Sequence, residues 1–124
     1  MTDIWKIKKN IVLSIMELAK AAYPNEFSGM LVGDKDDKII DDIYIIPATT
    51  NNLFSSSIRT DLVPMSLSVI GSVHSHPNNY SHPSTADLRF FSSKSINIIA
   101  HYPYSPESFV AYNSKGEEMS VKII

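Results

Sequence analysis

The stretch VHSHPNNYSHPSTADL, residues 73–88, joins the end of an apolar segment to the start of an amphipathic one. Three of the four histidines of the chain fall within it, His74, His76 and His82. From His74 to Asp87 the spacing reads H-x-H-x7-S-x2-D. The stretch is either a polar loop that happens to be rich in histidine or a binding site, and the spacing has to distinguish the two.

The two closely spaced histidines lie at the end of a predicted strand, Val69–His76. Side chains alternate between the faces of a strand, so His74 and His76 are expected side by side, with Ser75 on the opposite face. Two imidazoles on one face are a natural start for a Zn²⁺ site, and a carboxylate such as that of Asp87 can supply a third ligand. Three protein ligands and one water form the arrangement that catalytic zinc sites use.

A structural alternative exists for the second half of the stretch. Ser84 is a good N-cap residue, and Asp87 three positions later completes a capping-box pattern at the start of a helix. Capping and site chemistry can coexist in the same two residues. His82, beside Pro83, is expected in a loop, and His101 at the end of a strand.

The composition describes an ordinary globular chain and limits its chemistry. The sequence has 124 residues, 44% hydrophobic and 19% charged, which fits one domain over residues 1–124. It contains no cysteine, so any metal has to be held by nitrogen and oxygen atoms. A net charge of -2 and a pI of about 6.0 give no basic face for nucleic acid.

No apolar run approaches the roughly 20 residues that a membrane-spanning helix needs. The apolar positions near the N-terminus are interrupted by Glu17 and Lys20, which is not the pattern of a signal peptide. A cytoplasmic protein without a membrane partner is therefore expected.

The order of predicted elements is a helix, several strands, a second helix and further strands. This order predicts an α+β fold with a single sheet, mostly antiparallel or mixed, flanked by helices. The helices are expected from Ile7 to Pro24 and from Ser84 to about Lys94. The expected strands, in addition to Val69–His76, are Glu26–Gly33, Lys38–Ala48, a possible strand through Ile58–Thr60, Ile96–Tyr102, Ser108–Asn113 and Met119–Ile124, with a turn or helical fragment at Asp61–Ser68.

The segment GSVHSHPNNYSHPSTAD, residues 71–87, resembles a known family. It matches the JAMM motif H-[ST]-H-P-x6-S-x2-D of the MPN (Mov34/JAB) metalloprotease superfamily at every motif position. In that family a glutamate precedes a small-residue apolar strand, and PNEFSGMLVG fits this description with Glu26. The resemblance extends over nearly the whole chain and is greatest to compact archaeal JAMM proteins. It implies an MPN/JAB fold, which is cytidine deaminase-like.

The resemblance also implies roles for individual residues. His74, His76 and Asp87 would hold one Zn²⁺ per chain. Glu26 would be the general acid/base, which takes a proton from the attacking water and passes it to the leaving amine. Ser84 would donate a hydrogen bond to the oxyanion of the tetrahedral intermediate, and Ser75 would support the site.

The activity implied is that of a zinc-dependent isopeptidase. Its substrate would be the bond between the C-terminus of a ubiquitin-like protein and an amine, with the tail lying along a sheet edge near the zinc. One alternative is a JAMM peptidase that processes a small sulfur-carrier protein. The other is a non-catalytic MPN scaffold that only binds partners, against which the intact set of motif residues argues.

Overall fold

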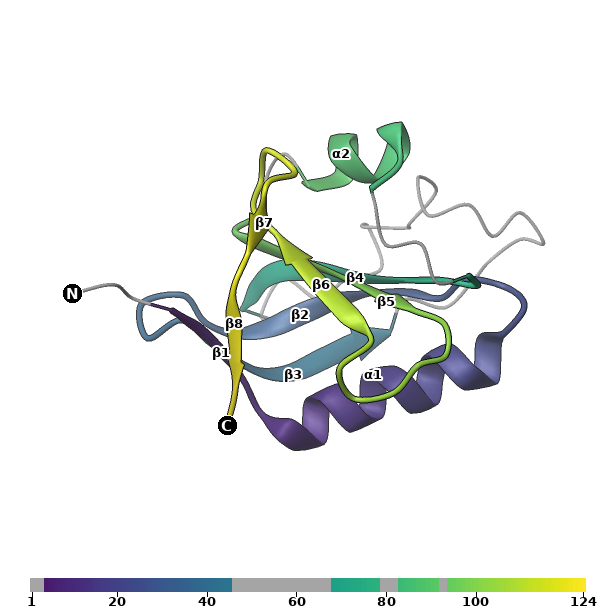
Figure 1. The fold of residues 1–124 in the computed structure, drawn as a ribbon. Helices are drawn as coiled ribbons and strands as arrows, with labels where there is room; N and C mark the ends of the chain where they lie inside the picture. The colour runs from purple at the N-terminus through teal and green to yellow at the C-terminus, as the bar shows by residue number, and fades with distance from the viewer. Residues whose placement is uncertain (1–3, 46–67, 79–82, 92–93) are drawn as a thin grey trace.

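A computed structural model describes residues 4–45, 68–78, 83–91 and 94–124 of the chain (Figure 1). Among these residues, no helix is long and apolar enough to cross a membrane. The elements in chain order are β1 (Trp5–Ile7), α1 (Lys9–Ala22), β2 (Ser28–Asp34), β3 (Ile39–Ile45), β4 (Val69–His76), α2 (Thr85–Phe91), β5 (Ile96–His101), β6 (Phe109–Tyr112), β7 (Glu118–Met119) and β8 (Val121–Ile123).

All the described strands belong to one sheet, in the order β7-β6-β5-β4-β2-β3-β1-β8. Its pairs are antiparallel between β2 and β3, β2 and β4, β5 and β6, and β6 and β7. The pairs β1–β3, β1–β8 and β4–β5 are parallel. The fold is therefore α+β with a mixed sheet, as the sequence predicted.

The two end strands of the sheet, β7 and β8, are consecutive in the chain and only Ser120 separates them. A single residue cannot span an open sheet of this width. The sheet must therefore curl until its two edges approach each other, and the C-terminal segment runs from one edge to the other (Figure 1).

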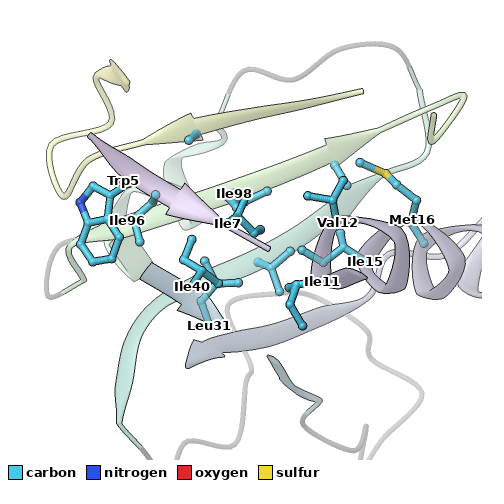
Figure 2. Close-up of a cluster of buried hydrophobic side chains, with 14 of the residues drawn as sticks. Trp5, Ile7, Ile11, Val12, Ile15, Met16, Leu31, Ile40, Ile96 and Ile98 are labelled. Carbon is cyan, nitrogen blue, oxygen red and sulfur yellow. The ribbon is translucent and has the colours of Figure 1, made fainter. Parts of the chain in front are cut away.

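Helix α1 lies along one face of the curled sheet and buries its apolar side chains there (Figure 1). Ile11 and Ile15 recur at helical spacing and meet Leu31 and Ile40 of the sheet (Figure 2). Burial of each such side chain contributes about 1.5–3 kcal/mol, so this cluster stabilises the scaffold of the molecule. Its buried members are Trp5, Ile7, Ile11, Val12, Ile15, Met16, Ala19, Leu31, Ile40, Ile70, Val73, Ile96, Ile98, Ala100, Tyr104 and Ala111.

The expected start of the first helix at Ile7 is wrong. Ile7 belongs to β1, and the helix begins at Lys9. Trp5 and Ile7 are both buried and alternate with the less buried Lys6, which is the period of a strand. The strand is held by parallel pairing with β3 and β8, and partners so distant in the sequence leave no local signal.

Smaller differences concern the ends of other elements. The strand expected from Glu26 begins at Ser28. The second helix is described over Thr85–Phe91, and positions 92–93 near its expected end lie outside the described residues. The single C-terminal strand is divided into β7 and β8, because its two halves pair with opposite edges of the sheet. The expected strand through Ile58–Thr60 lies outside the described residues, as do positions 46–48 and 61–67 of two other expected elements.

The central strand β4 is paired on both sides, with β2 and with β5. Val73 on this strand packs into the core beneath α1. The alternation of side chains therefore turns His74 and His76 to the other face, on which α2 lies (Figure 1). Because β4 has no free edge, a bound peptide cannot extend the sheet at this strand.

Candidate metal and catalytic site

The end of β4 carries the two histidines of the motif. His74 is 1% exposed and Ser75 is fully buried, whereas His76 at the end of the strand is partly accessible. The register of β4 against β2 places Ser28 directly beside His74. The expected placement of both imidazoles on one face, with Ser75 on the other, agrees with the contacts described below.

Ser28 holds the ring of His74. Its hydroxyl lies 3.2 Å from Nδ1 of His74. When Nδ1–H donates a hydrogen bond to that hydroxyl, the Nε2 atom presents its lone pair to the site, as a metal-ligating histidine requires. Burial lowers the pKa of His74 to about 4, an effect that the nearby Asp87 only partly offsets. The imidazole is therefore neutral at pH 7, which is the form that binds metal.

His76 and Asp87 contact each other directly. Nε2 of His76 lies 3.3 Å from Oδ2 of Asp87. Two ligands of one tetrahedral Zn²⁺ lie about 3.4 Å apart, because each stands about 2.0–2.2 Å from the ion. The backbone carbonyl of His76 accepts a hydrogen bond of 3.0 Å from the Tyr104 hydroxyl, which fixes this end of β4.

Asp87 is positioned by the first turn of α2. Its backbone N–H donates to the Ser84 hydroxyl at 3.0 Å, and the Ser84 N–H donates to Oδ2 of Asp87 at 2.9 Å. This reciprocal pair is the capping box that the sequence predicted. Burial by itself would raise the pKa of Asp87, but the hydrogen bonds from His76 and from Ser84, together with the charges of the histidines, lower it to about 2.

Glu26 lies in the connection between α1 and β2, two residues before the strand begins. Burial raises the pKa of its carboxyl above the ordinary value of 4.5, the charge of His76 opposes this rise and that of Asp87 adds to it. The carboxyl of Glu26 is thus close enough to both residues to feel their charge. A half-buried carboxyl with a raised pKa beside a potential metal ligand is suited to proton transfer.

The donor set fits zinc in its chemistry. Two imidazoles and one carboxylate are a ligand set of catalytic zinc sites, and the pair formed by His76 and Asp87 has the required spacing. Within the described part of the chain, no three His, Cys, Asp or Glu side chains yet surround one point closely enough to hold a metal ion.

Two supporting residues were missed by the sequence reasoning, Ser28 and Tyr104. Ser28 could have been found only from the register of β2 against β4, which pairs it with His74. Tyr104 reaches His76 from a loop after β5, and no local pattern indicates this. His101 stands in register beside His76 and its Nδ1 lies 3.1 Å from the carbonyl oxygen of Tyr102. His82 lies outside the described residues.

Comparisons with known proteins agree with this geometry. The model of the family described as prokaryotic homologs of the JAB domain matches residues 8–113. A protein of Haloferax volcanii described as a probable metalloprotease is 36% identical over 117 residues, which cover 88% of this chain and 73% of the relative. A JAB1/MPN domain protein from Archaeoglobus fulgidus has a similar structure, with a TM-score of 0.77, 31% identity and 99% of both chains covered. A structure described as a JAMM metalloprotease-like zinc site in the proteasome and signalosome gives a TM-score of 0.75, 34% identity and 98% coverage of both chains.

Proposed function

Since this chain belongs to the family of prokaryotic homologs of the JAB domain, we propose that it is a zinc-dependent isopeptidase of the JAMM type. The bond hydrolysed would join the C-terminus of a ubiquitin-like protein to an amine. The observation that carries the proposal is the 3.3 Å contact between His76 and Asp87, with the carboxyl of Glu26 near both. A cytoplasmic location is part of the same proposal.

His74, His76 and Asp87 would hold one Zn²⁺ per chain. When bound there, the ion would act as a Lewis acid that lowers the pKa of water and polarises the scissile carbonyl. His74 is kept neutral by burial and is oriented by Ser28, so it needs no deprotonation at pH 7. Asp87 is ionised at any pH near neutral, because its pKa is about 2.

Glu26 would move the proton. Its carboxylate would accept a proton from the attacking water and then deliver it to the nitrogen of the leaving amine. A raised pKa makes the carboxylate a stronger base for the first half of this transfer, and the carboxyl group is still acidic enough to release the proton in the second.

Ser84 would stabilise the developing charge. Its oxygen accepts the backbone N–H of Asp87, and a hydroxyl that accepts one hydrogen bond still has its own hydrogen to donate. That hydrogen would bind the oxyanion of the tetrahedral intermediate. Removal of such a donor typically lowers kcat by about 10²–10³-fold.

The experiment that tests the proposal offers conjugates of ubiquitin-like proteins to the zinc-loaded protein and identifies the products by mass spectrometry. Release of an intact modifier with a free C-terminus, abolished by a chelator and restored by zinc, is expected. Release of amino acids or short peptides from the C-terminus of a small sulfur-carrier protein would replace this activity by the alternative one. Stable binding of such proteins without any cleavage would mean a non-catalytic scaffold.

Zinc content provides a second test. The double variant His74→Ala/His76→Ala should lose the metal, whereas the control His101→Ala should retain it. Metal analysis after dialysis measures both. Stoichiometric zinc in the double variant would exclude this ligand set.

A further inference from the structure

Three tyrosines gather at one end of the sheet, next to the site. The ring centroids of Tyr23 and Tyr102 are 5.5 Å apart with an interplanar angle of 33°, and both rings meet Tyr104 nearly edge-on, at 6.2 and 5.8 Å. Tyr104 is 2% exposed, but Tyr23 and Tyr102 are 48% and 47% exposed. The cluster therefore has a buried anchor and an accessible pair of rings.

The buried anchor joins the tyrosines to the catalytic end of β4. The Tyr104 hydroxyl donates to the carbonyl of His76 at 3.0 Å, and the backbone N–H of Tyr102 donates to the carbonyl of Asn78 at 2.9 Å. His76 and Asn78 of the motif segment are thus hydrogen-bonded to the loop after β5, which carries Tyr102 and Tyr104. The backbone of Tyr102 and the side chain of Tyr104 are therefore held close to His76.

The same cluster borders Glu26. Tyr23 precedes Glu26 by three residues in the connection between α1 and β2. The pKa of Tyr104 is raised mainly by burial, and the charges of Tyr23, Glu26 and Tyr102 raise it further. The carboxyl of Glu26 therefore lies within electrostatic reach of the aromatic cluster as well as of His76 and Asp87.

We propose that the exposed rings of Tyr23 and Tyr102 bind the amine-donating half of the substrate, and that their occupant is the alkyl chain of a lysine residue whose amine carries the acyl group. This inference rests on the proposed function. Glu26 has to deliver its proton to the leaving nitrogen, so the leaving group must approach on the side of Glu26. Both rings contact Tyr104, whose hydroxyl is bonded to the carbonyl of His76, so they are exposed apolar surface near this end of the site.

The chemistry of the rings suits this occupant. The two tilted rings offer exposed apolar surface, on which the methylene groups of a lysine side chain can pack. The free amine that is released becomes a cation, and both aromatic faces and a carboxylate attract cations. A leaving group without the alkyl chain loses the methylene contact with the rings, so the rings would make the enzyme select lysine.

A matched pair of substrates tests the inference in the zinc-loaded, full-length protein. Both carry the same ubiquitin-like C-terminus, joined in one to the side-chain amine of a lysine peptide and in the other to glycinamide. In Tyr23→Ala/Tyr102→Ala, the ratio of kcat/KM for the lysine substrate to kcat/KM for the glycinamide substrate should fall about tenfold, mainly through KM. Tyr23→Phe/Tyr102→Phe keeps the rings and should restore the ratio.

Truncation of an exposed apolar side chain elsewhere gives the control. Leu13 is 43% exposed on α1, and Leu13→Ala should leave the ratio unchanged. An unchanged ratio in the double alanine variant, or the same loss for both substrates, would overturn the inference. The two single alanine variants replace the double one if thermal unfolding shows that it is not folded.

A binding measurement separates this inference from the proposed function. Saturation-transfer NMR with Nε-acetyl-lysine amide reports contact between its methylene groups and the protein without any turnover. Saturation transfer to the methylene groups should be observed in the wild type and lost in Tyr23→Ala/Tyr102→Ala. This result supports lysine binding even if no conjugate is cleaved. If conjugates are cleaved but saturation transfer to the methylene groups is equal in the wild type and the variant, the proposed enzymatic activity stands and the role of the rings is refuted.

Discussion

The hydroxyl of Ser75 accepts a hydrogen bond of 2.8 Å from the backbone N–H of Phe27, and the backbone N–H of Ser75 donates to the carbonyl of Phe27 at 3.0 Å. Ser75 is fully buried between the two histidines of β4. Phe27 is the residue directly after Glu26. This pair of hydrogen bonds therefore sets the position of Glu26 relative to His74 and His76, although Ser75 itself faces away from the site.

Ser75→Ala should remove one of the two hydrogen bonds that hold Phe27 and, through it, position Glu26. The Phe27 N–H would lose its partner in a partly buried place, which costs about 1–3 kcal/mol of stability. We expect zinc to remain bound and kcat to fall several-fold, because Glu26 is less well held. Thermal unfolding, metal analysis and kinetics measure the three effects.

Ser75→Thr is the matched control, since threonine keeps the hydroxyl and is the other residue that the motif H-[ST]-H admits. It should recover most of the lost kcat. If Ser75→Ala is destabilised but turns over substrate at the wild-type rate, Ser75 supports the fold alone and does not position Glu26.

The local part of the site could be predicted from the sequence. Alternation along a strand placed His74 and His76 on one face, and the serine and aspartate spacing predicted the capping box of Ser84 and Asp87. Both predictions concern residues that are close in the chain. The structure of β4 and the first turn of α2 confirms the local geometry.

Contacts between distant segments could not be predicted in this way. Glu26 was selected by family resemblance, because its proximity to His76 depends on the antiparallel register of β2 against β4. The same holds for Ser28 beside His74. The sequence predicts a helix from Ile7, but Ile7 ends the strand Trp5–Ile7, whose partners Ile39–Ile40 and Val121–Ile123 are far away in the sequence.

Glu26→Gln should retain the fold and the zinc but abolish hydrolysis. Glutamine has nearly the same shape as glutamate and cannot accept and release the proton, so the loss reports proton transfer rather than packing. Glu17→Gln is a suitable control, because the Glu17 side chain is 77% exposed on α1. The assay is hydrolysis per bound zinc, and wild-type turnover by Glu26→Gln would assign the acid/base role to another residue.

Asp87 should make the stability of the chelator-treated protein depend on pH. Its pKa of about 2 lies below the ordinary 3.8, so its ionised form stabilises the fold above pH 3.8 and this contribution is lost as the pH falls towards 2. The shift corresponds to about 2 kcal/mol. Urea unfolding in EDTA between pH 2 and 6 should show this slope in the wild type and a smaller one in Asp87→Asn. Equal slopes would show that Asp87 is not held in its ionised form by His76 and Ser84.

Ser84 can be tested for two roles with one pair of substitutions. As a cap alone, Ser84→Ala should cost about 1 kcal/mol of stability and leave kcat nearly unchanged. As an oxyanion donor, the same change should lower kcat by about two orders of magnitude while zinc stays bound. We expect the second result, because the capping contact uses the oxygen of the hydroxyl as acceptor and not its hydrogen.

Ser84→Asn sharpens the contrast, since asparagine also caps helices well but places its donor farther from the backbone. The capping contact with the Asp87 N–H should survive, so unfolding should resemble that of the wild type and zinc should remain. The displaced donor should no longer meet the oxyanion, and kcat should fall as it does in Ser84→Ala. A stable, zinc-loaded and fully active Ser84→Asn variant would limit Ser84 to the cap, and catalysis would then depend on the metal and Glu26.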